Sequence, residues 1–301
     1  MKPALCASCA VCLIAACASR PQPEAPMTTE TLSPSPVTRG HLPVNGLQMY
    51  YEIHGAGGGA PLVLLHGGGS TIDTTYGRIL PWFARHRRVI AVEEQAHGRT
   101  SDRGHPVRFE TSADDVASLL AQLHVTSADV MGFSNGASIA LQVAIRHPAL
   151  VRKLVFASSM TKRAGAGRAF WDAIEHATFE DMPQPLKDGF LRVTPDPQKL
   201  RTMYERDIER MRSFRDVPDA SVASVAVPVL VVTGDRDVPT LEHAVELSHL
   251  MPHARLLVLP GGHGDYLGEL LAAHDSRYAE LTAWLIEQFL DAPADASPVG
   301  R

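Results

Sequence analysis

From His41 onward, short apolar runs alternate with longer amphipathic stretches along most of the chain. A strand that is covered by helices on both faces reads as a continuous apolar run, whereas a surface helix is apolar on one face only. Runs typical of buried strands occur in PLVLLHGGG, RRVIAVEEQ, SADVMGFSNG, VRKLVFASS, PVLVVTGDRD and ARLLVLPGG. The alternation predicts an α/β fold, with a mostly parallel sheet and helices on both of its faces.

Two more strands are expected before these runs, which makes the predicted sheet eight-stranded. The stretch VNGLQMYYEIHG carries Asn45-Gly46, a strong signal for a type I′ hairpin turn, between short runs that can alternate in and out of a sheet. At the other end, the pattern predicts an amphipathic helix over residues 276–290. We therefore expect one folded domain over residues 41–291, followed by a disordered tail at 292–301.

One block interrupts the alternation after the sixth predicted strand. Between residues 159 and 227 we find no convincing buried strand, and the sequence instead shows short helical patterns such as GRAFWDAIEHA and PQKLRTMYERDIERMRSF, separated by prolines. This pattern predicts a helical cap, inserted over about residues 160–226.

The first forty residues have a different character. Residues 1–18 contain Lys2, an apolar stretch and then small residues, which is the layout of an export signal. The tetrapeptide IAAC, residues 14–17, resembles the lipobox of bacterial lipoproteins, which implies cleavage before Cys17 and lipidation of its thiol. Residues 19–40 are rich in Pro, Ser and Thr and predict an extended linker. We expect an exported protein, anchored in the cell envelope by lipid or, alternatively, periplasmic or secreted.

Composition and charge exclude several classes of function. The 301 residues are 45% hydrophobic and carry a formal net charge of −5 without a basic stripe, so nucleic acid is not an expected partner. The four cysteines all lie within the first 17 residues, so the mature domain has neither a disulfide nor a catalytic thiol. The chain also has no metal-ligand cluster, phosphate loop or dinucleotide motif, and we expect no metal and no cofactor.

The most informative motif is Gly132-Phe133-Ser134-Asn135-Gly136. It lies between a predicted strand and a predicted helix, and a serine on such a sharp turn is the nucleophile elbow of acyl-transfer enzymes. The two glycines stand where a side chain would collide with a neighbouring segment. The pattern predicts Ser134 as a nucleophile.

A second motif, HGGG at residues 66–69, follows the third predicted strand. Backbone N–H groups held in such a loop stabilise the negative oxygen of a tetrahedral intermediate. We expect the N–H groups of Gly68 and Asn135 to form this oxyanion hole, and we interpret His66 as structural.

A carboxylate that orients the base is expected after a later strand, and PVLVVTGDRDVPT offers Asp235 and Asp237. We predict Asp237, because the first Asp of such a pair ordinarily stabilises the turn. In an elbow architecture the histidine follows the acid in the chain. His243, His249, His253 and His274 fall on or beside predicted helices or before a strand, whereas His263 in LPGGHGDY follows a strand directly. We therefore predict His263 as the base.

Together these motifs give the domain a family resemblance. Residues 41–291 resemble the α/β-hydrolase superfamily, and specifically its serine esterase-like members with a helical cap, through HGGG, AHGRT, GFSNG, GDRDVP and GGH in that order. Two segments depart from the family pattern: Glu94-Gln95-Ala96-His97 replaces acidic-Arg-Gly-His, and GDYLGE follows the base. Both are expected to touch the rim of the pocket.

The resemblance implies two-step hydrolysis through an acyl-enzyme. The expected substrate is a carboxylic ester of a small, largely uncharged molecule, because acidic and basic residues are balanced in the cap. Lactone, thioester, peracid and carbon–carbon bond chemistry use the same triad and stay open, as does a non-catalytic binding protein on this scaffold. Apolar stripes on the cap helices could line an acyl pocket or pack against the domain: Phe170, Trp171, Ile174, Met203, Tyr204, Met211 and Phe214.

Overall fold

A computed structural model describes residues 38–272 and 276–293. The predicted signal peptide, Cys17, most of the predicted linker and the end of the C-terminal tail lie outside these residues. Within the described part of the chain, no helix combines the length and the apolar character needed to span a membrane.

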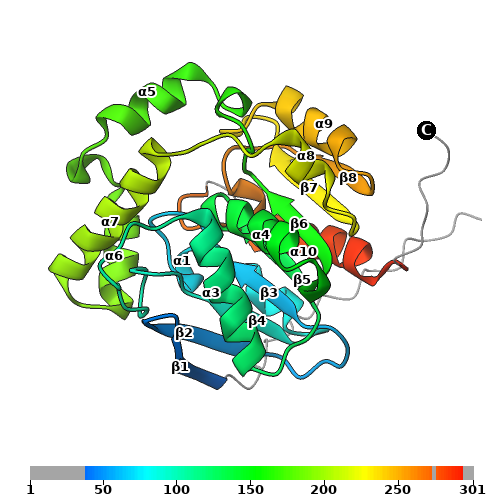
Figure 1. Ribbon diagram of the computed structural model, residues 1–301, viewed down its shortest axis with the longest axis horizontal. Helices are drawn as coiled ribbons and strands as arrows, with labels where there is room; N and C mark the ends of the chain where they lie inside the picture. Colours follow the sequence, from blue (N-terminus) through cyan, green and yellow to red (C-terminus); the bar gives the residue numbers. More distant parts are fainter. Residues whose placement is uncertain (1–37, 273–275, 294–301) are drawn as a thin grey trace, which may run out of the picture. The chain divides into compact units, whose positions relative to one another are not determined.

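The domain is built on one eight-stranded sheet with strand order β1-β2-β4-β3-β5-β6-β7-β8 (Figure 1). The pairs β1–β2 and β2–β4 are antiparallel, and the remaining pairs are parallel. The strands are β1 (Thr38–Val44), β2 (Leu47–His54), β3 (Leu62–Leu65), β4 (Val89–Val92), β5 (Ala128–Phe133), β6 (Val151–Ala157), β7 (Val229–Gly234) and β8 (Ala254–Leu259). The predicted α/β fold and mostly parallel sheet are confirmed.

The first hairpin forms where the sequence predicts it. Asn45 and Gly46 join β1 to β2 with φ angles of 46° and 86°, the left-handed backbone that a type I′ turn requires at both positions. β1 begins at Thr38, however, within the segment predicted as linker. Its alternately exposed edge residues need few apolar side chains to pair with β2, so composition alone did not reveal the start of the strand.

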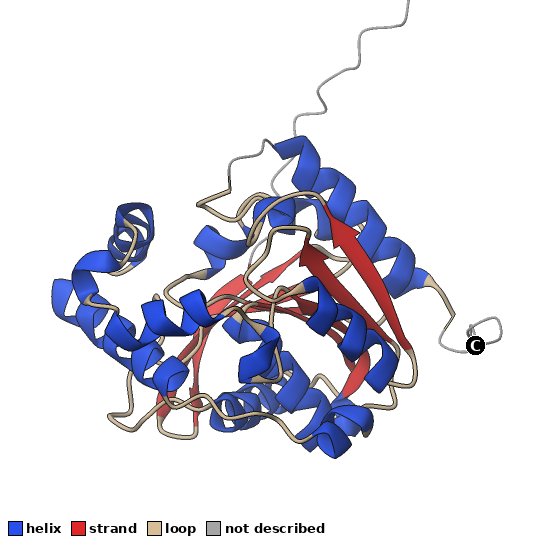
Figure 2. Ribbon diagram, turned by 90° about the horizontal axis from the view of Figure 1, so that it is seen from above, coloured by secondary structure: helices blue, strands red, loops and turns tan. Residues whose placement is uncertain are grey.

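Helices cover both faces of the sheet, which lies edge-on between them in Figure 2. One apolar cluster packs α3, α4, α8 and α9 against the first face, and a second packs α1, α2 and α10 against the other. The helices are α1 (Ile72–Tyr76), α2 (Leu80–Phe83), α3 (Phe109–Gln122), α4 (Asn135–Arg146), α5 (Arg168–His176), α6 (Gln184–Val193), α7 (Pro197–Arg212), α8 (Asp219–Ala223), α9 (Leu241–Leu250) and α10 (Ser276–Asp291).

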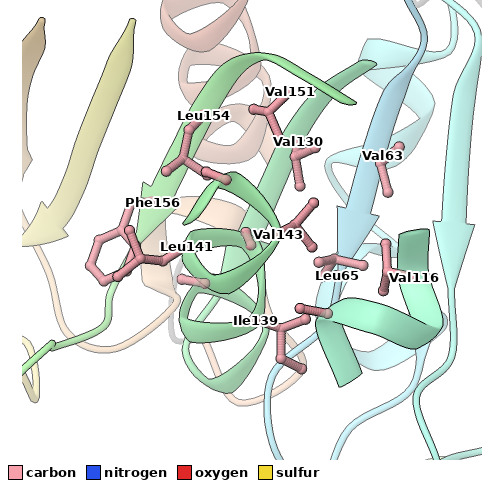
Figure 3. Close-up of a cluster of buried hydrophobic side chains, with 14 of the residues drawn as sticks. Val63, Leu65, Val116, Val130, Ile139, Leu141, Val143, Val151, Leu154 and Phe156 are labelled. Atoms are coloured by element: carbon pink, nitrogen blue, oxygen red, sulfur yellow. The ribbon is translucent and has the colours of Figure 1, made fainter. Parts of the chain in front are cut away.

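Helix α4 is the best buried helix of the described chain, and this burial positions the predicted nucleophile. Its first ten residues are all buried, and Ile139, Leu141 and Val143 pack against side chains of β3, β5 and β6 (Figure 3). Each such side chain stabilises the fold by about 1.5–3 kcal/mol when it is buried. The turn between β5 and α4 is therefore held from both sides by the core.

Helices α5 to α8 follow β6 and precede β7, at the predicted position of the insertion, and we call residues 160–226 the cap. The longest cap helix, α7, begins after Asp196, whose side chain accepts hydrogen bonds from the Gln198 and Lys199 N–H groups. The cap has two apolar clusters of its own, one around Trp171 and Phe214 and the other around Met203 and Phe190.

Candidate active site

Ser134 lies in the turn that joins β5 to α4. Its backbone has φ 54° and ψ −122°, a region that residues other than glycine rarely occupy. The Ser134 N–H donates a hydrogen bond to the Ala157 carbonyl oxygen (2.9 Å), which ties the strained turn to the end of β6. The turn places Ser134 at the carboxyl end of β5, where it lines a cavity.

The flanking glycines are required by close backbone contacts. A Cβ on Gly132 would lie 2.0 Å from the carbonyl oxygen of Gly136, and a Cβ on Gly136 would lie 2.1 Å from the carbonyl oxygen of Leu65. Both distances are far shorter than van der Waals contact. The turn therefore excludes every other residue type at these two positions unless the backbone moves.

Asp237 and His263 meet although 26 positions separate them in the chain. Asp237 follows β7 and His263 follows β8, and the two strands are paired in parallel, so both loops leave the same edge of the sheet. The His263 Nδ1 lies 2.6 Å from the Asp237 Oδ1. The Asp237 side chain is fully buried, whereas the His263 side chain is 32% exposed and lines the same cavity as Ser134.

The Asp237 carboxylate is held by further donors. Its Oδ2 accepts hydrogen bonds from the Gly234 N–H (3.0 Å) and the Thr233 hydroxyl (3.2 Å), and its Oδ1 accepts one from the Val238 N–H (2.7 Å). Burial alone raises the pKa of Asp237, but the hydrogen bonds and the charge of His263 outweigh it and lower that pKa below its ordinary value. Asp237 is thus an oriented carboxylate at neutral pH.

Sequence analysis missed two supporting residues, Ser158 and Tyr266. The Ser158 hydroxyl donates to the Asp237 Oδ2, and the Tyr266 hydroxyl lies 2.6 Å from the same Ser158 oxygen. Ser158 also has a positive φ of 52°, immediately after β6. A serine directly after a strand was a usable signal for Ser158, but no local pattern pointed to Tyr266.

Asp235 has a different partner. Its Oδ1 accepts a hydrogen bond from the Gly261 N–H (2.7 Å), so it joins the loop after β7 to the loop that carries His263. Of the two predicted carboxylates, the structure therefore places Asp237, and not Asp235, against the histidine ring.

Gly68 and Asn135 lie side by side beneath the cap. A Cβ on Gly68 would lie 2.4 Å from the Asn135 Nδ2, so the glycine loop approaches the start of α4 closely. Within the described residues, neither the Gly68 N–H nor the Asn135 N–H donates a hydrogen bond to the protein. Two backbone donors are thus available next to Ser134, as an oxyanion hole requires.

His66 is fully buried at the base of this loop. Its Nε2 accepts a hydrogen bond from the Glu94 N–H (3.2 Å), and its Nδ1 donates to the Gly67 carbonyl oxygen (2.8 Å). Burial lowers the pKa of His66 to about 4, so the ring is neutral. With both nitrogens bonded to the backbone, His66 holds the loop and has no free nitrogen for chemistry.

The cavity at Ser134 has a volume of about 110 Å³. Six apolar and five polar residues form its walls: Phe109, Met160, Phe170, Met211, Phe214 and Val238, and Ser134, Asn135, Ser138, Ser159 and His263. A second cavity of about 230 Å³ shares four of these residues, Phe109, Ser138, Met160 and Phe214. The site suits a small acyl group, with further room behind Phe109 and Phe214.

The structure sorts the seven apolar cap residues that sequence analysis singled out. Phe170, Met211 and Phe214 line the cavity, whereas Trp171 and Ile174 pack in the cluster behind them. Met203 and Tyr204 belong to the other cap cluster. Wall and packing residues share a helix, since Phe170 and Trp171 both lie on α5 and Met203 and Met211 both lie on α7, so helical spacing alone did not separate them.

The departure at residues 94–97 does not line the cavity around Ser134, and neither does the GDYLGE segment, so the expectation that they touch its rim is wrong. Glu94 and His97 instead bind the cap helix α7: the Glu94 Oε2 accepts from Arg210 (3.0 Å), and the His97 Nε2 lies 2.8 Å from the Asp207 Oδ2. Sequence analysis missed Asp207 and Arg210, which looked like ordinary charges on an amphipathic helix.

Comparison with known proteins adds independent information. A family model described as the alpha/beta hydrolase fold matches residues 60–217, a range that contains Gly68 and Ser134 and ends before Asp237. The human protein named serine hydrolase BPHL is 27% identical over 250 residues, which cover 75% of this chain and 80% of that protein.

Two further relatives differ in the chemistry that their names state. The 2-hydroxymuconate semialdehyde hydrolase of Pseudomonas sp. (strain CF600) is 35% identical over 112 residues, 36% of this chain and 39% of that enzyme. The solved structure of Est816, described as an N-acyl homoserine lactone degrading enzyme, is 26% identical, with a TM-score of 0.63 over 82% of this chain and 99% of its own.

Proposed function

This chain is a hydrolase of the α/β-hydrolase family, and we propose that it cleaves a carboxylic ester of a small, largely uncharged substrate. In this proposal Ser134 is the nucleophile, His263 the base and Asp237 the carboxylate that orients the imidazole. The N–H groups of Gly68 and Asn135 form the oxyanion hole.

The observation that carries the proposal is the meeting of Ser134 and His263 in one cavity, with the His263 Nδ1 already bonded to Asp237. This bond leaves the Nε2 of a neutral ring to accept the serine proton. The strained turn at Ser134 supports the same role, because backbone strain of this kind is retained where function requires it.

Each step uses groups that the site provides. The Ser134 Oγ attacks the ester carbonyl carbon while its proton passes to the His263 Nε2, and the negative oxygen of the tetrahedral intermediate accepts from Gly68 and Asn135. Collapse of the intermediate breaks the bond to the alcohol, which leaves with the proton from His263. Water then attacks the acyl-enzyme, again with His263 as base, and releases the acid.

A second candidate is cleavage of a lactone or of a carbon–carbon bond next to a carbonyl. Two relatives favour it, since one is named as a semialdehyde hydrolase and another as a lactone-degrading enzyme. The cavity favours a simple ester, because its volume is only about 110 Å³ and six of its eleven wall residues are apolar.

Covalent labelling tests the proposal directly. A fluorophosphonate probe should label the wild-type protein on Ser134, and the folded Ser134→Ala variant should not be labelled. Turnover of p-nitrophenyl acetate and butyrate should fall by about 10³-fold or more in that variant. A folded Ser134→Ala protein with wild-type turnover would contradict the nucleophile. Rates measured on a panel of esters, thioesters, lactones and diketones then show which of the two candidate reactions the protein catalyses faster; the diketones test carbon–carbon bond cleavage.

We also propose that the protein is an exported, lipid-anchored protein of a bacterial envelope, on the basis of residues 1–18 and the IAAC tetrapeptide. Expressed with its own signal in a Gram-negative host, the wild type should fractionate with membranes. Cys17→Ser should block processing or release the protein from membranes. Unprocessed wild-type chain in the cytosol would contradict export.

A further inference from the structure

The oxyanion loop is anchored from two directions. Three consecutive glycines, Gly67 to Gly69, have unusual backbone freedom, so their N–H groups need outside contacts to point in fixed directions. The Gly67 N–H donates to the Thr75 hydroxyl (3.3 Å), and the Gly67 carbonyl oxygen accepts from His66 (2.8 Å). Both of these anchors belong to the body of the domain.

The other anchor comes from the cap. The Gly69 N–H donates to the carboxylate of Asp207, a residue of α7 that lies 138 positions further along the chain. The same carboxylate lies against Gly68, since a Cβ built there would be 3.1 Å from the Asp207 Oδ2. Gly68, the donor assigned to the oxyanion hole, is therefore held between a body anchor and a cap anchor.

The Asp207 carboxylate is compensated so that it can lie near a site of developing negative charge. Its Oδ2 accepts from the His97 Nε2 (2.8 Å), its Oδ1 accepts from Arg210, and Arg210 also binds Glu94 (3.0 Å). All four residues are buried, at 8% exposed or less. Burial alone raises the pKa of Asp207, but the charges of His97 and Arg210 outweigh it and hold that pKa well below its ordinary range.

We propose that Asp207 is a positioning residue for the oxyanion hole, and that the hole is complete only when α7 is docked on the domain. The carboxylate fixes the Gly69 N–H and with it the Gly68–Gly69 peptide, while His66 holds the preceding peptide, which carries the Gly68 N–H, through the Gly67 carbonyl oxygen. With a peptide anchored on each side, the backbone angles of Gly68 and the direction of its N–H are fixed. Acyl transfer is thereby coupled to the docked position of the cap. This inference rests on the proposed esterase function.

The test compares Asp207→Asn and Asp207→Ser with a matched control, Arg206→Gln. Arg206 is the preceding residue of α7, and it also joins cap to body through Asp102 (2.9 Å). Its polar partners in the described part of the chain are Asp102 and Glu209, and neither belongs to the glycine loop. The Asp207 variants should lose about 10²-fold in kcat with KM changed by no more than about threefold, the size of effect seen when one oxyanion donor is lost. Arg206→Gln should leave kcat within about threefold.

A trifluoromethyl ketone separates positioning from a merely structural role. Ser134 converts this inhibitor to a hemiketal anion that needs the same N–H donors, so its inhibition constant should rise in the Asp207 variants by the factor that kcat falls. An unchanged inhibition constant, or a kcat within about threefold of wild type in folded Asp207 variants, would overturn the proposal.

Hydrogen exchange in the wild-type protein tests the contact between Gly69 and Asp207 directly. It needs neither an activity measurement nor a folded variant. In the wild-type protein the Gly69 amide should exchange as slowly as the amides inside α7, because both are released when the helix undocks. Exchange at Gly69 much faster than in α7 would overturn the proposal. If Ser134→Ala keeps full activity, the proposed function fails instead, and the exchange result still decides whether the cap holds the loop.

Discussion

The His263–Asp237 and His97–Asp207 pairs have similar geometry, with N–O distances of 2.6 Å and 2.8 Å, but different surroundings. Among the described residues, His263 bonds to protein through Nδ1 and not through Nε2, and its ring lines a cavity. His97 is fully buried and uses both nitrogens, Nδ1 toward the Gln95 carbonyl oxygen and Nε2 toward Asp207. Because both of its partners are acceptors, His97 must carry two protons.

This difference distinguishes the base that we propose at His263 from the structural cation at His97. A ring nitrogen that is left free beside a serine can take up and return a proton, whereas a ring that donates from both nitrogens has no site for one. The contrast also explains why the carboxylates have distinct tasks. In the proposed mechanism Asp237 orients an imidazole for chemistry, whereas Asp207 balances the buried positive charge of His97 and Arg210 and accepts a hydrogen bond from the Gly69 N–H.

The largest expected effect is on catalysis at the first pair. Asp237→Asn should lower kcat for a p-nitrophenyl ester by about 10³- to 10⁴-fold, because the amide stabilises the wrong tautomer of His263. Steady-state kinetics at pH 8 measure it. Asp235→Asn, which only weakens the hydrogen bond from the Gly261 N–H, is the matched control and should stay within about tenfold. The reverse order would move the acid to Asp235.

The second-largest expected effect is on the free energy of unfolding, which the two aspartate substitutions should lower by different amounts. Asp207→Asn should lower the free energy of unfolding by about 3 kcal/mol, since it leaves the buried cations His97 and Arg210 with one carboxylate fewer. Asp237→Asn should cost about 1 kcal/mol, because a neutral amide still satisfies most of its hydrogen bonds. Urea unfolding at pH 7 gives both values. Equal losses would mean that the two carboxylates stabilise the fold alike.

The free energy of unfolding should also depend on pH through two neighbouring histidines, His66 and His97. Their ring centroids are 4.9 Å apart, but their pKa values are shifted in opposite directions. Burial alone lowers the pKa of His97, but Asp207 raises it above the ordinary value of 6.5. The stability that His97 contributes is therefore complete below pH 6.5 and is lost as the pH rises through the raised pKa. The stability gap between wild type and His97→Gln should narrow from pH 6 to pH 9.

His66 should behave in the opposite sense. Its pKa falls from 6.5 to about 4 in the folded state, so below pH 6.5 the unfolded chain binds a proton that the folded protein does not. The wild type should lose roughly 3 kcal/mol from this group between pH 6.5 and pH 4, and His66→Asn should remove that part of the slope. Urea unfolding across the range measures both variants, and slopes of the same sign would contradict the assignment of charge.

The smallest expected effect lies on the segment that carries His97. Ala96 has a φ of 66°, where an alanine is strained by about 1–2 kcal/mol relative to glycine. Ala96→Gly should raise the free energy of unfolding by roughly 0.5 kcal/mol, after the extra freedom of glycine in the unfolded chain is subtracted, and leave kcat unchanged. Ala117→Gly, in the regular helix α3, should instead be destabilising by about 1 kcal/mol.

Local sequence predicted the features that depend on near neighbours in the chain. The apolar runs of β3 to β7 predicted the central strands, because a strand buried on both faces is largely apolar, and the half-exposed edge strand β8 also has an apolar run. Gly132 and Gly136 marked the turn at Ser134, because their steric requirement is local. The positions of Asp237 and His263, each just after a predicted strand, also placed both segments at the same edge of the sheet. Loops that follow parallel strands leave the sheet on the same side. The catalytic roles of these residues stay predictions.

Only the tertiary structure decided which distant side chains meet. The Ser158 hydroxyl meets Asp237 across 79 positions of chain and Tyr266 across 108, and Asp207 reaches Gly69 across 138. No periodicity encodes any of these contacts. The sequence determined that α7 is an amphipathic helix, but not that Asp207 and Arg210 face Glu94 and His97. Helical spacing fixes which residues share a face, whereas the docking of that face depends on the packing of the whole domain.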